Sequence, residues 1–353
     1  MNTIKKYLRP EQLREFSLLI IIALAIVVFG SQIDGYYTGR TFNRVSTSVA
    51  IIMVVAVGET LVVLTRNIDL SVGSIVGFTA YFIGQQLSGN QDIPPLVVLA
   101  IAMGFGALLG LVNGILVAYG NIPAVLVTLG TLAIYRGILV RYSDAQTILT
   151  NNLPDWIIDL PRVNLFTAGE FEVRLVVGIA VLAIIVFQLV LIYLPFGRRL
   201  YAIGSNPDAA PVAGIPRRRI VTVAFMLSGA LSGLGGFMYL ARFGTITVEA
   251  ARGTELQVIA AVVVGGVNIF GGSGTMFGVM LGAILIGTLE QSLIRIQEIS
   301  EFWKDALLGA FILTAIAIDA VILNRIRDLW ASAELELTSE DNADTSAHTS
   351  SLN

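Results

Sequence analysis

Long apolar runs separated by short polar segments dominate the chain. A membrane-spanning helix needs about 20 mostly apolar residues. Runs of this kind lie approximately at residues 16–34, 45–65, 71–88, 95–119, 122–141, 173–194, 220–241, 255–268, 275–294 and 302–323. Apolar residues occupy all sides of these segments, as expected of helices covered by lipid or by other helices. The pattern predicts an all-α polytopic membrane bundle of about ten transmembrane helices. The short run 255–268 predicts a broken or re-entrant helix.

Composition argues against a soluble enzyme. Of the 353 residues, 55% are hydrophobic and 13% are charged, whereas a soluble domain is about 25% charged. The chain has no cysteine and one histidine, His348, so thiolate metal sites and histidine-based catalysis are not expected. None of its three lysines follows glycine, so the phosphate-binding G-x-x-x-x-G-K-[ST] loop is absent. We expect no enzyme activity and no cofactor bound by this chain, with any ATP and magnesium held by a partner.

The predicted loops differ in charge. Segment 195–219 carries five arginines and one acid, whereas segment 142–172 carries five acids and one arginine. The positive-inside rule therefore places the first segment in the cytoplasm and the second outside. An even number of spans then places both termini in the cytoplasm.

These assignments predict three regions. Residues 1–15 form a cytoplasmic N-terminus, and residues 16–324 form the transmembrane domain with its cytoplasmic segment 195–219. Residues 325–353 form a cytoplasmic tail. Its last part, 331–353, holds five acids, eight Ser or Thr residues and no Lys or Arg, a composition typical of a largely disordered chain.

Polar residues within the apolar runs are candidates for a translocation path, because a charge at the centre of a spanning helix costs about 2.5–3.5 kcal/mol. Asp69 and Ser71 interrupt two runs, where they either cap a tight turn or line a cavity at a helix break. The alternative for the charged residues is a position near the membrane surface. The candidate path residues are Glu59, Asn67, Asp69, Ser71, Asn113, Thr128, Thr131 and Glu290.

A second candidate site lies in the arginine-rich segment. Asn206 and Pro207 predict the start of a short helix, Asp208 adds a favourable negative charge to its first turn, and Gly214 ends it. A short helix with small residues between basic flanks suits docking in a groove of a partner; the plain alternative is a connecting helix. The candidate coupling residues are Gly204, Ser205, Asn206, Pro207, Asp208, Ala209, Ala210 and Gly214.

Several motifs together resemble the permease subunits of bacterial ABC sugar importers, the group that includes the ribose, xylose, rhamnose and autoinducer-2 permeases. The motifs are G-R-R-L-Y-A-I-G-S-N-P-D-A-A-P-V-A-G-I at 197–215, I-D-L-S-V-G-S at 68–74, N-G-I-L-V-A-Y-G-N-I-P at 113–123, V-T-L-G-T at 127–131, E-L-Q-V-I-A-A-V-V-V-G-G at 255–266 and G-G-S-G-T at 271–275. They occur in the family's order, and residues 204–214 match its coupling segment position by position.

The resemblance implies a permease of the bacterial inner membrane that imports a monosaccharide or related polyol. Such permeases pair as a homodimer or as a heterodimer with a paralogue, dock on separate ABC ATPase subunits and receive cargo from a substrate-binding protein. The lipid bilayer is their surroundings, and no nucleic acid is involved.

The chain also departs from the family pattern. Arg66 and Asn67 stand where the family commonly has two glycines, and Glu290-Gln291-Ser292 replaces a common Asn-Gly-Leu. The ending at 297–319 is most similar to the rhamnose or autoinducer-2 branch. Two alternatives remain at this stage: an ABC permease for nucleosides or branched-chain amino acids, and an ion-coupled secondary transporter that uses Glu59 and Glu290.

Overall fold

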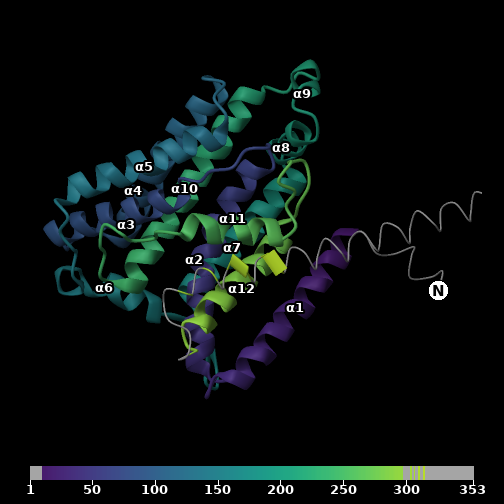
Figure 1. Cartoon of the computed structure of the whole chain (residues 1–353). Helices are drawn as coiled ribbons and strands as arrows, with labels where there is room; N and C mark the ends of the chain where they lie inside the picture. The colour runs from purple at the N-terminus through teal and green to yellow at the C-terminus, as the bar shows by residue number, and fades with distance from the viewer. Residues whose placement is uncertain (1–9, 297–302, 304–305, 307–308, 311–312, 315–353) are drawn as a thin grey trace, which may run out of the picture. The chain divides into compact units, whose positions relative to one another are not determined.

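The computed structural model describes residues 10–296, 303, 306, 309–310 and 313–314. The chain divides into two compact units, Met1–Asp305 and Ala306–Asn353. The described residues of the second unit are helical. The first unit is built mainly of helices (Figure 1).

The apolar runs fold as helices. The main ones are α1 (Pro10–Gln32), α2 (Gly39–Val63), α3 (Val72–Gly89), α4 (Pro95–Ala118), α5 (Ala124–Ser143), α7 (Leu175–Tyr193), α10 (Arg217–Phe243), α11 (Thr254–Val264) and α12 (Met276–Leu293). Shorter elements are η1 (Thr150–Asn152), α6 (Asp155–Asp159), η2 (Leu160–Arg162), α8 (Pro195–Ser205) and α9 (Ala209–Val212).

The observed helices confirm the predicted fold class. Nine of the ten predicted runs coincide with main helices, while the run 302–323 and the tail 325–353 lie largely or wholly outside the described residues. Within the described part, seven helices are long and apolar enough to cross a membrane. Helix α3 is not among them, and α11 has only 11 residues. The predicted number of ten spans therefore stays a prediction.

Helices α2 and α10 form the interior of the unit. In the most apolar stretch of α2, 83% of the residues are buried, compared with 17% in α1 and 22% in α4. Small residues allow α4 and α10 to approach closely: a Cβ added to Gly110 would lie 2.3 Å from the Phe225 carbonyl oxygen. Close packing through small residues is typical of helices within membranes.

The unit has two ends, between which α2 runs. At the arginine-rich end, residues 64–67 and 195–219 lie beside residues 266–275, and the Leu64 oxygen accepts a hydrogen bond from the Gly272 N–H at 3.2 Å. At the hairpin end, the loop before α2 lies beside the end of α12, where the Tyr36 and Ser292 hydroxyls are 2.8 Å apart. The arginine-rich and acid-rich loops thus lie at opposite ends.

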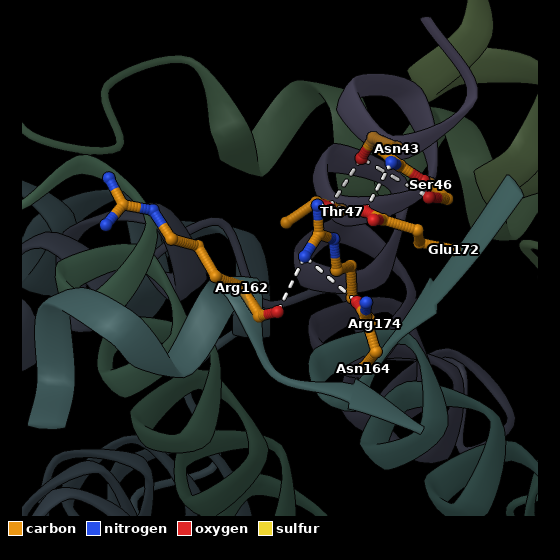
Figure 2. A network of polar contacts seen from close by, with 7 residues as sticks. All are labelled: Asn43, Ser46, Thr47, Arg162, Asn164, Glu172 and Arg174. Atoms are coloured by element: carbon orange, nitrogen blue, oxygen red, sulfur yellow. Dashed lines mark hydrogen bonds and ion pairs between the residues drawn. The ribbon is translucent and has the colours of Figure 1, made fainter. Parts of the chain in front are cut away.

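A small antiparallel hairpin gives the hairpin end its name, with β1 at Asn164–Ala168 and β2 at Phe171–Arg174. Figure 2 shows how it is fixed to α2: Glu172 accepts a hydrogen bond from the Asn43 amide at 2.9 Å and pairs with Arg174. Arg174 also donates to the Arg162 carbonyl oxygen at 2.6 Å. This hairpin was not predicted, because its strands of five and four residues show no alternation of buried and exposed positions.

Candidate functional site

The break between α2 and α3 holds a cluster of buried polar groups. The chain leaves α2 at Val63, turns and folds back so that the Asp69 N–H donates to Glu59 Oε1 at 2.9 Å. Asp69 Oδ1 accepts from the Ser71 N–H at 2.9 Å and from the Ser71 hydroxyl at 2.6 Å. Asp69 therefore stabilises the turn that leads into α3. The predicted side-chain cap is not seen, because the N-cap residue Ser71 makes no side-chain hydrogen bond to the helix.

Two further helices join this cluster. Asn113 of α4 donates its amide N–H to Ser71 Oγ at 2.7 Å. Tyr135 of α5 donates to the Leu109 carbonyl oxygen at 2.9 Å, with Asn113 Oδ1 at 3.3 Å from the same hydroxyl. Thr128 of α5 lies 3.3 Å from the Ile68 carbonyl oxygen. The cluster thus connects α2, α3, α4 and α5 at one level of the bundle.

The cluster is sealed from solvent within this chain. Glu59, Asp69, Ser71 and Asn113 are all 0% exposed, and Glu59 Oε2 and Asp69 Oδ2 have no hydrogen-bond partner among the described residues. In this conformation the break between α2 and α3 is therefore a closed turn held by Asp69. These residues face the protein interior and not lipid.

The remaining path candidates lie elsewhere. Thr131 donates only to the Thr128 carbonyl oxygen in its own helix, at 3.4 Å. Asn67 lines a cavity at the arginine-rich end. Glu290 lies in the part of α12 that packs on the first half of α2, since a Cβ on Gly287 would be 2.6 Å from the Val49 side chain. Val49 precedes Glu59 by ten residues, about 15 Å along a helix, so the structure does not bring Glu290 and Glu59 together.

The segment between α10 and α11 turns back into the bundle. Ile246 pairs with Ile148 through hydrogen bonds of 3.0 Å. The chain then descends along α3, where a Cβ on Gly77 would lie 2.3 Å from the Ala250 oxygen and a Cβ on Gly73 would lie 3.0 Å from the Ala251 oxygen. Helix α11 consequently starts part-way through the bundle, which agrees with the broken helix predicted for this run.

Arg136 of α5 holds this re-entrant segment in place. Its Nη1 donates to the Val248 oxygen at 2.9 Å and to the Ala250 oxygen at 2.8 Å. Both carbonyl groups lie outside regular secondary structure, so Arg136 supplies hydrogen bonds that no helix or strand provides to them. Arg136 is therefore placed by pairing within the bundle, not by reaching to the membrane surface.

The re-entrant segment also brings charge to this level of the bundle. Glu249 and Arg252 form an exposed ion pair at 2.5 Å, and Glu255 Oε2 is buried without a hydrogen-bond partner among the described residues. Charged side chains between membrane-spanning helices are expected to face water or another protein surface, because lipid does not solvate them. The sequence analysis did not select these residues. The sequence does contain a signal for them: several charged residues lie between the apolar runs 220–241 and 255–268, and the second run is too short to span a membrane.

The coupling segment folds as predicted, but it is shorter. Helix α9 has four residues, and Asn206 caps it by accepting the N–H groups of Asp208 and Ala209 at 3.1 and 3.0 Å. Gly214 ends it with φ 75°, a left-handed conformation that glycine adopts without strain. The segment therefore forms a single capped turn that projects from the arginine-rich end (Figure 1).

The coupling candidates divide into exposed and buried groups. Ser205, Asn206, Asp208, Ala209 and Gly214 are exposed and Pro207 is half-buried. Ala210 is 3% exposed, and a Cβ on Gly204 would lie 2.0 Å from the Leu64 oxygen. Gly204 and Ala210 thus pack inward and hold the segment in place. Val212, which the sequence analysis did not select, is 90% exposed and offers an apolar contact on α9.

Arg66 connects the coupling segment with the helix break. Its Nε donates to the Gly204 oxygen at 2.6 Å, and its Nη2 donates to the Ser205 oxygen at 2.9 Å. Three residues later, Asp69 joins the buried cluster. Arg66 thus joins residues 204–205 to the segment that leads into α3.

A cavity of about 840 Å³ adjoins this region at the arginine-rich end. Its lining includes Asn67, Tyr119, Asn121 and Arg217–Arg219. The Arg218 guanidinium lies 5.9 Å from the centre of the Tyr119 ring, a cation–π contact. The cavity combines polar groups of the α2–α3 break and of the loop between α4 and α5 with the arginines that follow the coupling segment.

Comparison with known proteins identifies the family. The family described as "Branched-chain amino acid transport system / permease component" matches residues 41–316. The chain belongs to this family of membrane transport permeases. The match spans the helix break, the coupling segment and the re-entrant segment. This permease is thus a multi-pass membrane protein of an ABC importer, and its family is not one of enzymes.

Individual relatives agree with this assignment. The Autoinducer 2 import system permease protein LsrC of Salmonella typhi is 34% identical over 314 residues, covering 87% of this chain and 85% of the relative. LsrC of Escherichia coli O157:H7 is 33% identical over 329 residues, covering 90% and 92%. No solved structure gives a significant match. As the permease of an ABC importer, the protein works with an ATPase and a binding protein.

Proposed function

We propose that this permease imports a small polyhydroxylated molecule of the autoinducer-2 or monosaccharide class across the bacterial inner membrane. The observation that carries the proposal is the 34% identity to autoinducer-2 permeases over 87% of the chain. Many hydroxyl groups require many polar partners, and the re-entrant segment and the start of α11 supply Glu249, Arg252 and Glu255 within an apolar bundle. Branched-chain amino acids are a second candidate cargo, favoured by the description of the family.

The proposed path runs along the re-entrant segment, not through the buried cluster. Glu249, Arg252 and the exposed Leu256 lie on a surface of the single chain that is unsuited to lipid because it carries charge. We propose that a second copy or a paralogue covers this surface, so that cargo passes between two permeases. Both termini and the arginine-rich end would then face the cytoplasm.

Energy is proposed to enter through the coupling segment. No ATP or magnesium would bind to this chain; the partner ATPase would hold both and would contact Asn206, Ala209 and Val212. Closure of the ATPase would shift residues 204–205, and Arg66 would pass this shift to the break between α2 and α3. Helix α3 packs against Ala250 and Ala251, so its displacement would alter the re-entrant segment.

The cargo assignment is tested by reconstitution. The permease, its ATPase and its binding protein are placed in liposomes, and ATP-dependent uptake of labelled autoinducer-2, rhamnose, ribose, leucine and adenosine is measured. We expect uptake of autoinducer-2 or a monosaccharide. Uptake of leucine alone would favour the second candidate, and uptake of adenosine alone would contradict both.

The path is tested by cysteine accessibility, since the chain naturally lacks cysteine. Arg252→Cys should react with a hydrophilic thiol reagent in the assembled transporter and become protected by cargo. Glu59→Cys is the comparison position in the buried cluster and should stay unreactive in this conformation because Glu59 is 0% exposed. The reverse pattern would place the path through the buried cluster.

A further inference from the structure

A cavity at the hairpin end gathers positive charge. It has a volume of about 680 Å³, and its lining includes Arg40 and Arg44 from the start of α2 and Arg295 from beyond α12. Asp34 and Glu170 line the same cavity. Three guanidinium groups therefore face two carboxylates, which leaves an excess of one positive charge.

Two of these arginines have no partner in the described part of the chain. Arg40 and Arg44 form no hydrogen bond or ion pair among the described residues. They stand four residues apart on one helix, an arrangement in which like charges repel. Arg295, in contrast, is fixed: it donates to Thr41 Oγ1 at 2.7 Å and lies 5.8 Å from the centre of the Tyr36 ring. An anion in the cavity would remove the repulsion, and guanidinium groups bind phosphate well.

An apolar cavity adjoins the first one. It has a volume of about 200 Å³, shares Thr38 and Thr41 with the arginine cavity and is lined by Ile26, Phe42 and Phe171 among others. The rings of Phe42 and Phe171 meet edge to face at 5.6 Å. The neighbouring side chains of α1 are exposed and apolar, including Leu24, Val27 and Val28.

We propose that the two cavities together hold one anionic phospholipid. Its phosphate would lie between Arg40, Arg44 and Arg295, and the hydroxyl groups of a glycerol headgroup would donate to Asp34 and Glu170. An acyl chain would occupy the apolar cavity and continue along α1. Tyr36 and Tyr37 mark this level, because tyrosines are enriched where membranes meet water. The adjoining apolar cavity favours a lipid over a soluble phosphate, which has no group to fill it.

Native mass spectrometry of the full-length permease in detergent tests this proposal. The protein is titrated with dioleoyl phosphatidylglycerol, with dioleoyl phosphatidylcholine and with inorganic phosphate. We expect one phosphatidylglycerol to bind at least about tenfold more tightly than phosphatidylcholine. The choline headgroup places a positive charge beside the arginines and has no hydroxyl group to donate to Asp34 or Glu170. Inorganic phosphate at the same concentration should not displace it.

Two double variants separate the site from general charge effects. Arg40→Gln with Arg44→Gln should weaken phosphatidylglycerol binding at least about tenfold. Arg141→Gln with Arg162→Gln removes two exposed arginines near the same end, each paired with an aspartate, and should leave binding unchanged. Melting temperatures in lipid-free detergent should not fall for the first pair, since no bond is lost and the repulsion between the two arginines is relieved.

Phe42→Ser provides an independent variant, because it alters only the apolar cavity and should weaken binding of the dioleoyl lipid about threefold or more. Phe42→Ser also tests the proposal if the double variant of Arg40 and Arg44 folds poorly. Equal binding of phosphatidylglycerol by wild type and both cavity variants would overturn the proposal. Displacement by equimolar inorganic phosphate would reassign the site to a soluble anion, and equally tight phosphatidylcholine binding would reject an anionic lipid.

Discussion

Arg66 provides a sharp test of how the coupling segment acts on the helix break. Its backbone has φ 64°, a left-handed conformation that costs a non-glycine residue about 1 kcal/mol or more. Here the side chain compensates, because its guanidinium group binds the carbonyl oxygens of Gly204 and Ser205. Arg66→Gly removes both bonds and relieves the backbone at the same time.

These two effects partly offset each other in stability. A hydrogen bond from a charged donor contributes about 1.5–3 kcal/mol, but Arg66 is exposed and water replaces part of it, so we take about 1 kcal/mol for each bond. Two lost bonds against about 1 kcal/mol of relieved strain leave a net destabilisation of about 1 kcal/mol. The expected change in melting temperature is about 2 °C. Arg66→Ala, which keeps the strain, should be about 1 kcal/mol less stable than Arg66→Gly.

Arg66→Gly should impair transport more strongly than it lowers the stability of the fold. In liposomes containing the ATPase and the binding protein, we measure cargo molecules imported per ATP hydrolysed. Arg66→Gly should reach normal membrane levels and retain the ATPase, yet this ratio should fall at least about fivefold, because residues 204–205 no longer pull on the helix break. Arg199→Ala is the control, since Arg199 is an exposed arginine of α8. A wild-type ratio in Arg66→Gly would refute the proposed route.

Four further perturbations test other parts of the structure. Ala209→Arg adds bulk to the exposed face of α9 and should reduce ATPase co-purification without lowering membrane levels; normal uptake would disprove the docking assignment. Arg136→Met should release two carbonyl groups and lower the melting temperature by several degrees, whereas Arg141→Met should not. Asn113→Leu should destabilise by about 1–3 kcal/mol, measured by denaturation in detergent, because Ser71 loses its buried donor. Truncation after Trp330 should leave uptake near normal; lost uptake at normal expression would show that the acidic tail matters.

Local sequence was sufficient to predict the helices. Bilayer thickness fixes how many apolar residues a span needs, so runs such as 95–119 and 173–194 predicted α4 and α7 to within a few residues. Capping is also local: Asn206 and Gly214 set the ends of α9 through the chemistry of their own side chains and backbone. The charge difference between 142–172 and 195–219 likewise predicted that these loops lie at opposite ends.

Tertiary structure decided which polar groups meet. The sequence grouped Glu59 and Glu290 by type, yet helix packing places them at different levels of the bundle. The tertiary structure brings Glu59, Asp69 and Asn113 into one cluster because the loop after α2 folds back. No local sequence pattern specifies this fold-back. It also turned Arg136 toward Val248 and Ala250, more than a hundred residues away. Hydrophobicity selects the residues that enter the membrane, whereas the close packing of helices and the pairing of buried polar groups decide their partners.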